Sequence, residues 1–141
     1  MDQRISLITL GVSDVAAARA FYERLGWTAS SASMAEVVFF DMGGWIFGLY
    51  GQPELSKDSG LTDTSPVPGG ITLAYNTRSR EEVDHFMGVV KDAGATILND
   101  PVETPWGGYV GYFADPDGHP WEISWVPHFP IQEDGSLEIP K

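Results

Sequence analysis

The hydrophobic positions in the first half of the chain change from strand spacing to helix spacing. An apolar run over residues 5–12 predicts a short strand, and Ser13 and Asp14 after it are favourable helix N-caps. Apolar residues then recur at helical spacing from Val15 to Leu25, and Gly26 follows as a helix stop. This half therefore begins with a strand, a helix and a glycine turn.

The second half repeats this order. Residues 70–75 predict a strand, Ser79 and Glu82 have the spacing of a capping box, and an apolar helical stripe ends before Gly94. β-rich runs follow each predicted helix, at 27–31, 36–42 and 45–50 in the first half and at 96–98, 109–113 and 120–125 in the second. Because the pattern occurs twice, the sequence predicts an α+β fold of two tandem βαβββ modules.

The expected organisation is a single domain over residues 1–141. Module one covers about 4–55 and module two about 70–126. Residues 56–69, rich in Ser, Thr, Asp, Pro and Gly, read as a linker or flexible loop between them. The tail, 127–141, has no clear period, but its apolar residues suggest that it packs on something, such as a partner subunit.

Alternation along the predicted strands separates two faces. We assign the bulky apolar set to the helix-covered face: Ile8, Leu10, Phe47, Leu49, Ile71, Leu73, Tyr75, Trp121, Ile123 and Trp125. The other set is mostly small or polar: Leu7, Thr9, Ile46, Gly48, Tyr50, Gly70, Thr72, Ala74, Glu122 and Ser124. Such a face leaves room for a concave pocket, although it could also meet water or form a subunit interface. Trp106 and Tyr109, next to glycines, are candidates for the pocket mouth, and Trp106 could equally be a plug on the core.

Composition narrows the classes of function. The 141 residues contain 8 basic and 20 acidic side chains, for a net charge of −12, which disfavours nucleic acid as a partner. Cysteine is absent, which excludes disulfides, thiol nucleophiles and cysteine metal sites. No apolar run approaches the roughly 20 residues of a spanning helix. We expect a cytoplasmic protein without membrane contact, whose acidity could favour positively charged small molecules.

The last predicted hairpin, FADPDGHPWEI at 113–123, closes the second repeat and resembles the vicinal oxygen chelate superfamily. Supporting motifs are GVSD at 11–14, Phe21-Tyr22 with Leu25-Gly26, and AGA at 93–95. This superfamily includes glyoxalase I, extradiol dioxygenases, fosfomycin-resistance proteins and bleomycin-binding proteins. The resemblance implies modules that curve into an incomplete barrel around a central cleft, commonly within a homodimer.

In the metal enzymes of that superfamily, four inward positions on the first and last strands of the modules supply ligands. The resemblance places them at Leu7, Gly48, Gly70 and Glu122, of which only Glu122 can bind a metal. A catalytic ion needs about three protein ligands, so we expect no metal and no other cofactor. The histidines, His85, His119 and His128, read as surface or turn residues, and Asp115 and Asp117 as turn formers.

The interpretation we prefer is a metal-independent protein, similar to glyoxalase and bleomycin-resistance proteins, that binds a small organic molecule in its cleft. Glu122 would anchor a cationic or amine group, and Tyr50, Trp106 and Tyr109 would stack on a planar ligand. One alternative is a lyase, isomerase or dioxygenase of the same superfamily, with Glu122 as a base or a non-standard metal site. Another is an assembly protein that pairs subunits through the small-residue face.

Overall fold

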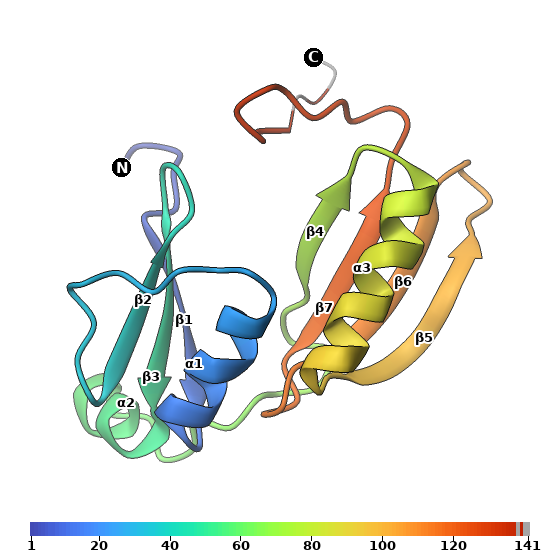
Figure 1. Cartoon of the computed structure of the whole chain (residues 1–141). Coiled ribbons are helices and arrows are strands. Elements are labelled where there is room, and N and C mark those ends of the chain that lie inside the picture. Colours follow the sequence, from blue (N-terminus) through green and yellow to red (C-terminus); the bar gives the residue numbers. More distant parts are fainter. Residues whose placement is uncertain (138, 140–141) are drawn as a thin grey trace. The chain divides into compact units, whose positions relative to one another are not determined.

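A computed structural model describes residues 1–137 and 139 of the chain, which divides into two compact units, Met1–Val67 and Pro68–Lys141. The first unit contains β1 (Leu7–Val12), α1 (Val15–Arg24), β2 (Val37–Asp41), β3 (Ile46–Gly51) and α2 (Gln52–Ser59). The second contains β4 (Leu73–Thr77), α3 (Arg80–Ala93), β5 (Thr96–Glu103), β6 (Tyr109–Ala114) and β7 (Pro120–Trp125) (Figure 1). The predicted α+β class and the tandem modules are confirmed.

The sheet of the first unit has three strands in the order β1-β3-β2, with β1 parallel and β2 antiparallel to β3. Helix α1 begins at Asp14, whose Oδ1 accepts the Ala17 amide at 2.9 Å, as the capping signal predicts. Tyr22 of α1 brings its ring to 5.0 Å from that of Phe47 on β3. The core of this unit therefore lies between α1 and one face of the sheet.

The predicted strand at 27–31 is wrong. Only an isolated bridge between Ala29 and Phe40 forms there. Trp27 instead stacks on Tyr22, with the ring centroids 5.3 Å apart, and its edge meets Phe40. The indole closes the aromatic core beside the helix, so only a short piece of this segment remains to pair with β2.

The second unit has a four-stranded sheet in the order β4-β7-β6-β5, and α3 packs against all four strands (Figure 1). The N-cap of α3 uses the predicted capping-box residues. Ser79 Oγ accepts a hydrogen bond from the Glu82 amide at 3.2 Å, and the Glu82 carboxylate accepts one from the Arg78 amide at 2.7 Å. Val83, Met87 and Val90 of α3 are buried, as their spacing predicts. Among the residues described, no helix is long and apolar enough to span a bilayer.

Other boundaries also differ from the sequence prediction, and β5 runs to Glu103 rather than ending at residue 98. The segment 56–69 is not wholly a loop, since α2 continues through Ser59 and ends at Gly60, which adopts a φ of 76°. Strand β4 begins at Leu73 rather than at residue 70, so Gly70 and Thr72 precede it. In the tail, a bridge joins Ile131 and Leu137, while residues 138, 140 and 141 lie outside the described part.

Candidate functional site

The face of the first sheet opposite α1 has the small, partly apolar surface that alternation predicts. Leu7 pairs with Ile46 and Thr9 pairs with Gly48 across β1 and β3, so these side chains share one face. Leu7 is 45% exposed and Ile46 42% exposed. A Cβ built on Gly48 would lie 3.4 Å from Thr9 Oγ1 and 3.6 Å from Leu7 Cδ1, without overlap. A side chain at Gly48, which is itself buried, would therefore touch Thr9 and Leu7.

Helix α2 and the loop after it cover the far end of the same face. A Cβ on Gly11 would lie 2.6 Å from the Thr64 carbonyl oxygen and 3.1 Å from Leu55 Cδ2. Tyr50, which pairs with Gly11, donates its phenol proton to Asp58 of α2 at 2.7 Å. That hydrogen bond, followed by desolvation and the charge of nearby carboxylates, raises the pKa of Tyr50. The part of the face left uncovered is thus its Leu7–Ile46 end.

Glu122 lies on the face of the second sheet opposite α3. It pairs with Ala74 of β4 on one side and with Tyr112 of β6 on the other, and Tyr112 donates its phenol proton to Glu122 Oε2 at 2.9 Å. Both side chains are half-buried. Burial first, and then the hydrogen bond to the carboxylate, raise the pKa of the Tyr112 phenol. One oxygen of the Glu122 side chain is therefore hydrogen-bonded to a neutral phenol.

Tyr109 lies on the opposite face from Glu122, so the two do not share a site. Its phenol donates to Asp84 of α3 at 2.8 Å, and Arg80 lies over its ring with the guanidinium carbon 5.3 Å from the centroid. The hydrogen bond to Asp84 is the first cause that raises the pKa of Tyr109. Because β6 alternates, Tyr109 joins Trp125 on the helix side.

The remaining predicted binding residues are spread over turns. Gly70 and Thr72 are exposed and precede β4, and Ala74 is the β4 residue that pairs with Glu122. Trp106 is 51% exposed in the turn between β5 and β6, and its ring occupies the space that a side chain at Gly108 would need. Trp106 is therefore neither buried in the core nor in a strand.

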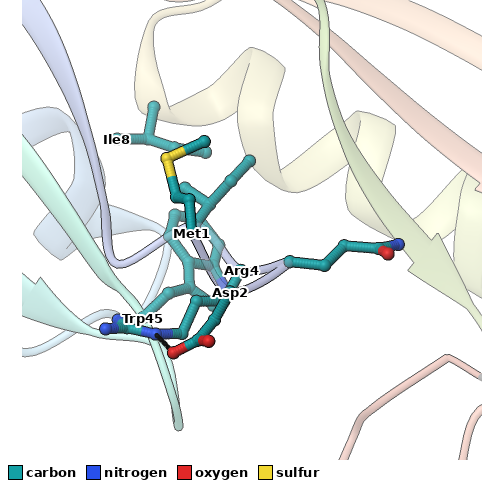
Figure 2. A pocket seen from close by; sticks show the side chains of 7 residues that line it. Met1, Asp2, Arg4, Ile8 and Trp45 are labelled. Carbon is teal, nitrogen blue, oxygen red and sulfur yellow. Dashed lines mark ion pairs between the residues drawn. The ribbon is translucent and has the colours of Figure 1, made fainter.

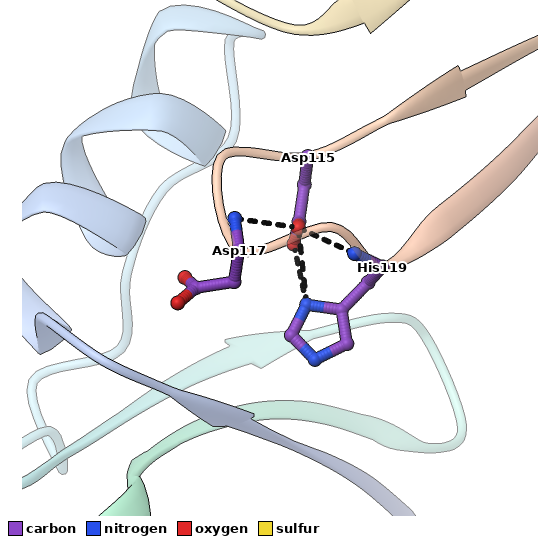
Figure 3. Close-up of polar contacts among 3 residues, drawn as sticks. All are labelled: Asp115, Asp117 and His119. Carbon is purple, nitrogen blue, oxygen red and sulfur yellow. Dashed lines mark hydrogen bonds and ion pairs between the residues drawn. The ribbon is translucent and has the colours of Figure 1, made fainter. Parts of the chain in front are cut away.

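The Asp115–His119 turn between β6 and β7 is built around one buried carboxylate (Figure 3). Asp115 Oδ1 accepts the backbone amides of Asp117 at 3.0 Å and His119 at 2.9 Å. Nδ1 of His119 lies 2.9 Å from Asp115 Oδ2 and 3.0 Å from Oδ1. Asp115 and His119 are only 3% and 7% exposed, so this pair stabilises the turn, as predicted for turn residues. His85 and His128 are exposed.

The residues present do not fit the metal centre that the superfamily's enzymes use. At the four expected positions, Leu7, Gly48 and Gly70 offer no side-chain donor, and Glu122 is hydrogen-bonded by Tyr112. Ala74, which replaces Gly70 as the strand neighbour of Glu122, offers none either. Within residues 1–137 and 139, no group of three or more His, Asp or Glu side chains could hold a metal ion. A stable site needs about three such donors at fixed geometry.

A separate apolar hollow of about 550 Å³ lies in the first unit, lined by Met1–Ile5, Ile8 and Trp45. Figure 2 shows the side chains of Met1, Ile8 and Trp45 around it, with the Asp2–Arg4 ion pair. None of the predicted binding residues lines this hollow. Ile8 belongs to the set that the sequence assigns to the helix side.

Comparison with known proteins agrees with this architecture. Residues 4–123 match the family model of the Glyoxalase/Bleomycin resistance protein/Dioxygenase superfamily. The structure is similar to that of a glyoxalase-related enzyme from Fulvimarina pelagi, with 38% identity, a TM-score of 0.90 and coverage of 97% of this chain and 98% of the other. A search of curated protein sequences finds no significant match.

More distant structures share the fold. A glyoxalase/bleomycin resistance protein/dioxygenase family enzyme from Burkholderia phytofirmans is 26% identical, with a TM-score of 0.75 and coverage of 86% of this chain and 97% of that one. Lactoylglutathione lyase from Agrobacterium tumefaciens is 23% identical, with a TM-score of 0.67 and coverage of 88% and 94%. The two βαβββ-type modules define a protein of the vicinal oxygen chelate class. This chain belongs to the Glyoxalase/Bleomycin resistance protein/Dioxygenase superfamily.

The residue that sequence reasoning missed is Tyr112. The sequence does contain a signal for it, which is the hairpin around the Asp115–His119 turn. Residues at equal distances from this turn face one another, which pairs Ala114 with Pro120, Tyr112 with Glu122 and Tyr109 with Trp125. The same count moves Tyr109 to the helix side with Trp125. The register of the hairpin, and not the alternation of each strand by itself, therefore assigns Tyr109 and Tyr112 to their faces of the sheet.

Proposed function

We propose that this protein binds a small organic molecule at the open face of its second sheet without a metal ion. The observation that carries the proposal is the state of Glu122, which is the one acidic side chain among the four ligand positions of the superfamily and is held by the Tyr112 phenol. A carboxylate in this setting can accept a hydrogen bond from a ligand through its second oxygen.

The glyoxalase-related protein from Fulvimarina pelagi is described as an enzyme, and the lyase from Agrobacterium tumefaciens shares the fold. The alternative is a lyase, isomerase or dioxygenase that uses Glu122 as a base toward an acidic C–H or holds a non-standard metal site, since the other three positions carry no titratable group. The Tyr112 phenol already donates to Oε2 of Glu122, which leaves Oε1 free to accept a hydrogen bond from a ligand. This favours an anchoring role for Glu122.

Metal titration of the purified, chelator-treated protein tests the proposal. We expect Zn²⁺, Ni²⁺, Mn²⁺ and Fe²⁺ to show no stoichiometric binding in calorimetry, and Glu122→Gln to give the same traces as the unaltered protein. Glu133→Gln, a change of equal charge at an exposed tail residue, is the matched control. One ion per chain that binds tightly and is lost only in Glu122→Gln would contradict metal independence.

A further inference from the structure

Glu122 is half-buried, and within residues 1–137 and 139 no ion pair to its carboxylate is found. In the described part of the chain, its carboxylate accepts a hydrogen bond from the neutral Tyr112 phenol at 2.9 Å. A partly desolvated carboxylate without a counter-charge favours a positively charged ligand over a neutral one of the same shape.

The surroundings of Glu122 set the direction from which such a ligand can approach. In the row of paired residues across the sheet, Glu122 stands between Ala74 and Tyr112, with Asn99 beyond the tyrosine. Ala74 is exposed and has no side chain beyond Cβ. The space beside Glu122 is therefore open over Ala74 and closed on the Tyr112 side by the phenol ring.

Tyr112 occupies Oε2 and leaves Oε1 of Glu122 as an acceptor. A ligand that carries both a positive charge and an N–H can donate to Oε1, while a quaternary ammonium has no proton to donate. The adjacent phenol ring offers an aromatic face for the cation or for an apolar substituent next to it. No Lys or Arg lies among the residues of this row to oppose the positive charge.

The geometry points to Tyr112 and Glu122 as one recognition element for a protonated amine that bears an N–H, with Tyr112 as the positioning residue for Glu122. This inference rests on the proposed function, because it names the class of ligand that the open face of the second sheet takes. A charge-assisted hydrogen bond is stronger than a neutral one, and that difference is the source of the selectivity.

Protein-observed NMR with three matched probes tests the inference, using benzylamine, benzyltrimethylammonium and benzyl alcohol with the full chain. We expect benzylamine to bind about tenfold more tightly than benzyl alcohol. Benzyltrimethylammonium should fall between them, because it keeps the charge and lacks the N–H. Amide shifts should cluster at Ala74, Tyr112 and Glu122.

Variants then separate recognition from a structural role. Glu122→Gln should bring benzylamine and benzyl alcohol to equal affinity. Tyr112→Phe keeps the ring but frees the Glu122 carboxylate, so it should weaken benzylamine about threefold to tenfold and lower its preference over benzyl alcohol. Tyr109→Phe is the matched control, because that phenol also donates to a carboxylate but on the α3 side, and it should leave the affinity ratio of the unaltered protein in place.

Two results would overturn the inference, and the first needs no variant. One is equal binding of the amine and the alcohol, or no binding of the amine, by the unaltered protein. The other is an amine preference that survives in Glu122→Gln. Either leaves metal-independent binding of another ligand standing, since that proposal is tested separately, by metal titration and by the presence of a bound organic molecule.

Discussion

Two tyrosines three residues apart on β6 make the same hydrogen bond on opposite faces of one sheet. Tyr109 donates to Asp84 of α3, and Tyr112 donates to Glu122 of β7. The first fixes the sheet to its helix, and the second orients a carboxylate on the face left free. Residue type alone could not separate these roles, which follow from register.

Gly11 shows how closely a single residue can be constrained. A methyl group there would meet the backbone oxygen of Thr64 at 2.6 Å, and a backbone oxygen cannot move aside as a flexible side-chain tip can. We predict that Gly11→Ala lowers the free energy of unfolding by about 1 to 3 kcal/mol, measured by urea denaturation.

The control for this substitution is Gly88→Ala. Gly88 is exposed in α3, and an added Cβ there meets nothing within 4 Å. Alanine is more favourable than glycine in a helix interior, so Gly88→Ala should raise the free energy of unfolding by about 0.5 to 1 kcal/mol. A neutral Gly11→Ala would show that α2 and the Thr64 loop do not pack on β1 as described.

At the scale of elements, turns and helix caps were the most predictable parts of the chain. The Ser79 cap, the Gly94 stop and the Asp115–Gly118 turn all follow from local residue chemistry. The 27–31 segment and α2 were not predicted correctly, because neither is decided locally. Trp27 gains more from the aromatic core than from pairing, and the short, polar α2 is held by contacts with β1 and β3.

The hairpin of β6 and β7 depends on the buried Asp115 carboxylate. Asp115→Ala removes the acceptor of two backbone amides and leaves the His119 ring nitrogen without its partner in a buried position. We predict a loss of about 2 to 3 kcal/mol in the free energy of unfolding, measured by urea denaturation.

Asp134→Ala is the matched control for Asp115→Ala. Asp134 accepts the Ser136 amide at 3.0 Å in a similar turn, but it is exposed. Asp134→Ala should lower the free energy of unfolding by less than about 0.5 kcal/mol. Equal losses for the two variants would mean that burial of Asp115 contributes nothing to the turn.

At the scale of the whole molecule, the sequence predicted two repeats, the superfamily and the position of Glu122, because each rests on a periodic or local pattern. It could not predict which small residues are tightly covered. Gly11 and Gly48 both lie on the face opposite α1, yet an added Cβ would overlap the Thr64 carbonyl oxygen at Gly11 and would make only ordinary contacts at Gly48. Such differences depend on contacts between distant segments.

Net charge acts at the same scale. A charge of −12 attracts cations to the whole surface, but only a placed carboxylate such as Glu122 distinguishes one cation from another. We therefore propose that Glu122 binds an organic ligand rather than a metal ion.

Native mass spectrometry of the protein, isolated gently from its own cells in the presence of a chelator, tests this claim most directly. We expect a chain that carries one small organic molecule and no divalent metal, with the organic adduct lost when the Glu122→Gln variant is isolated in the same way. A chain that retains one divalent ion, released only by that substitution, would contradict it.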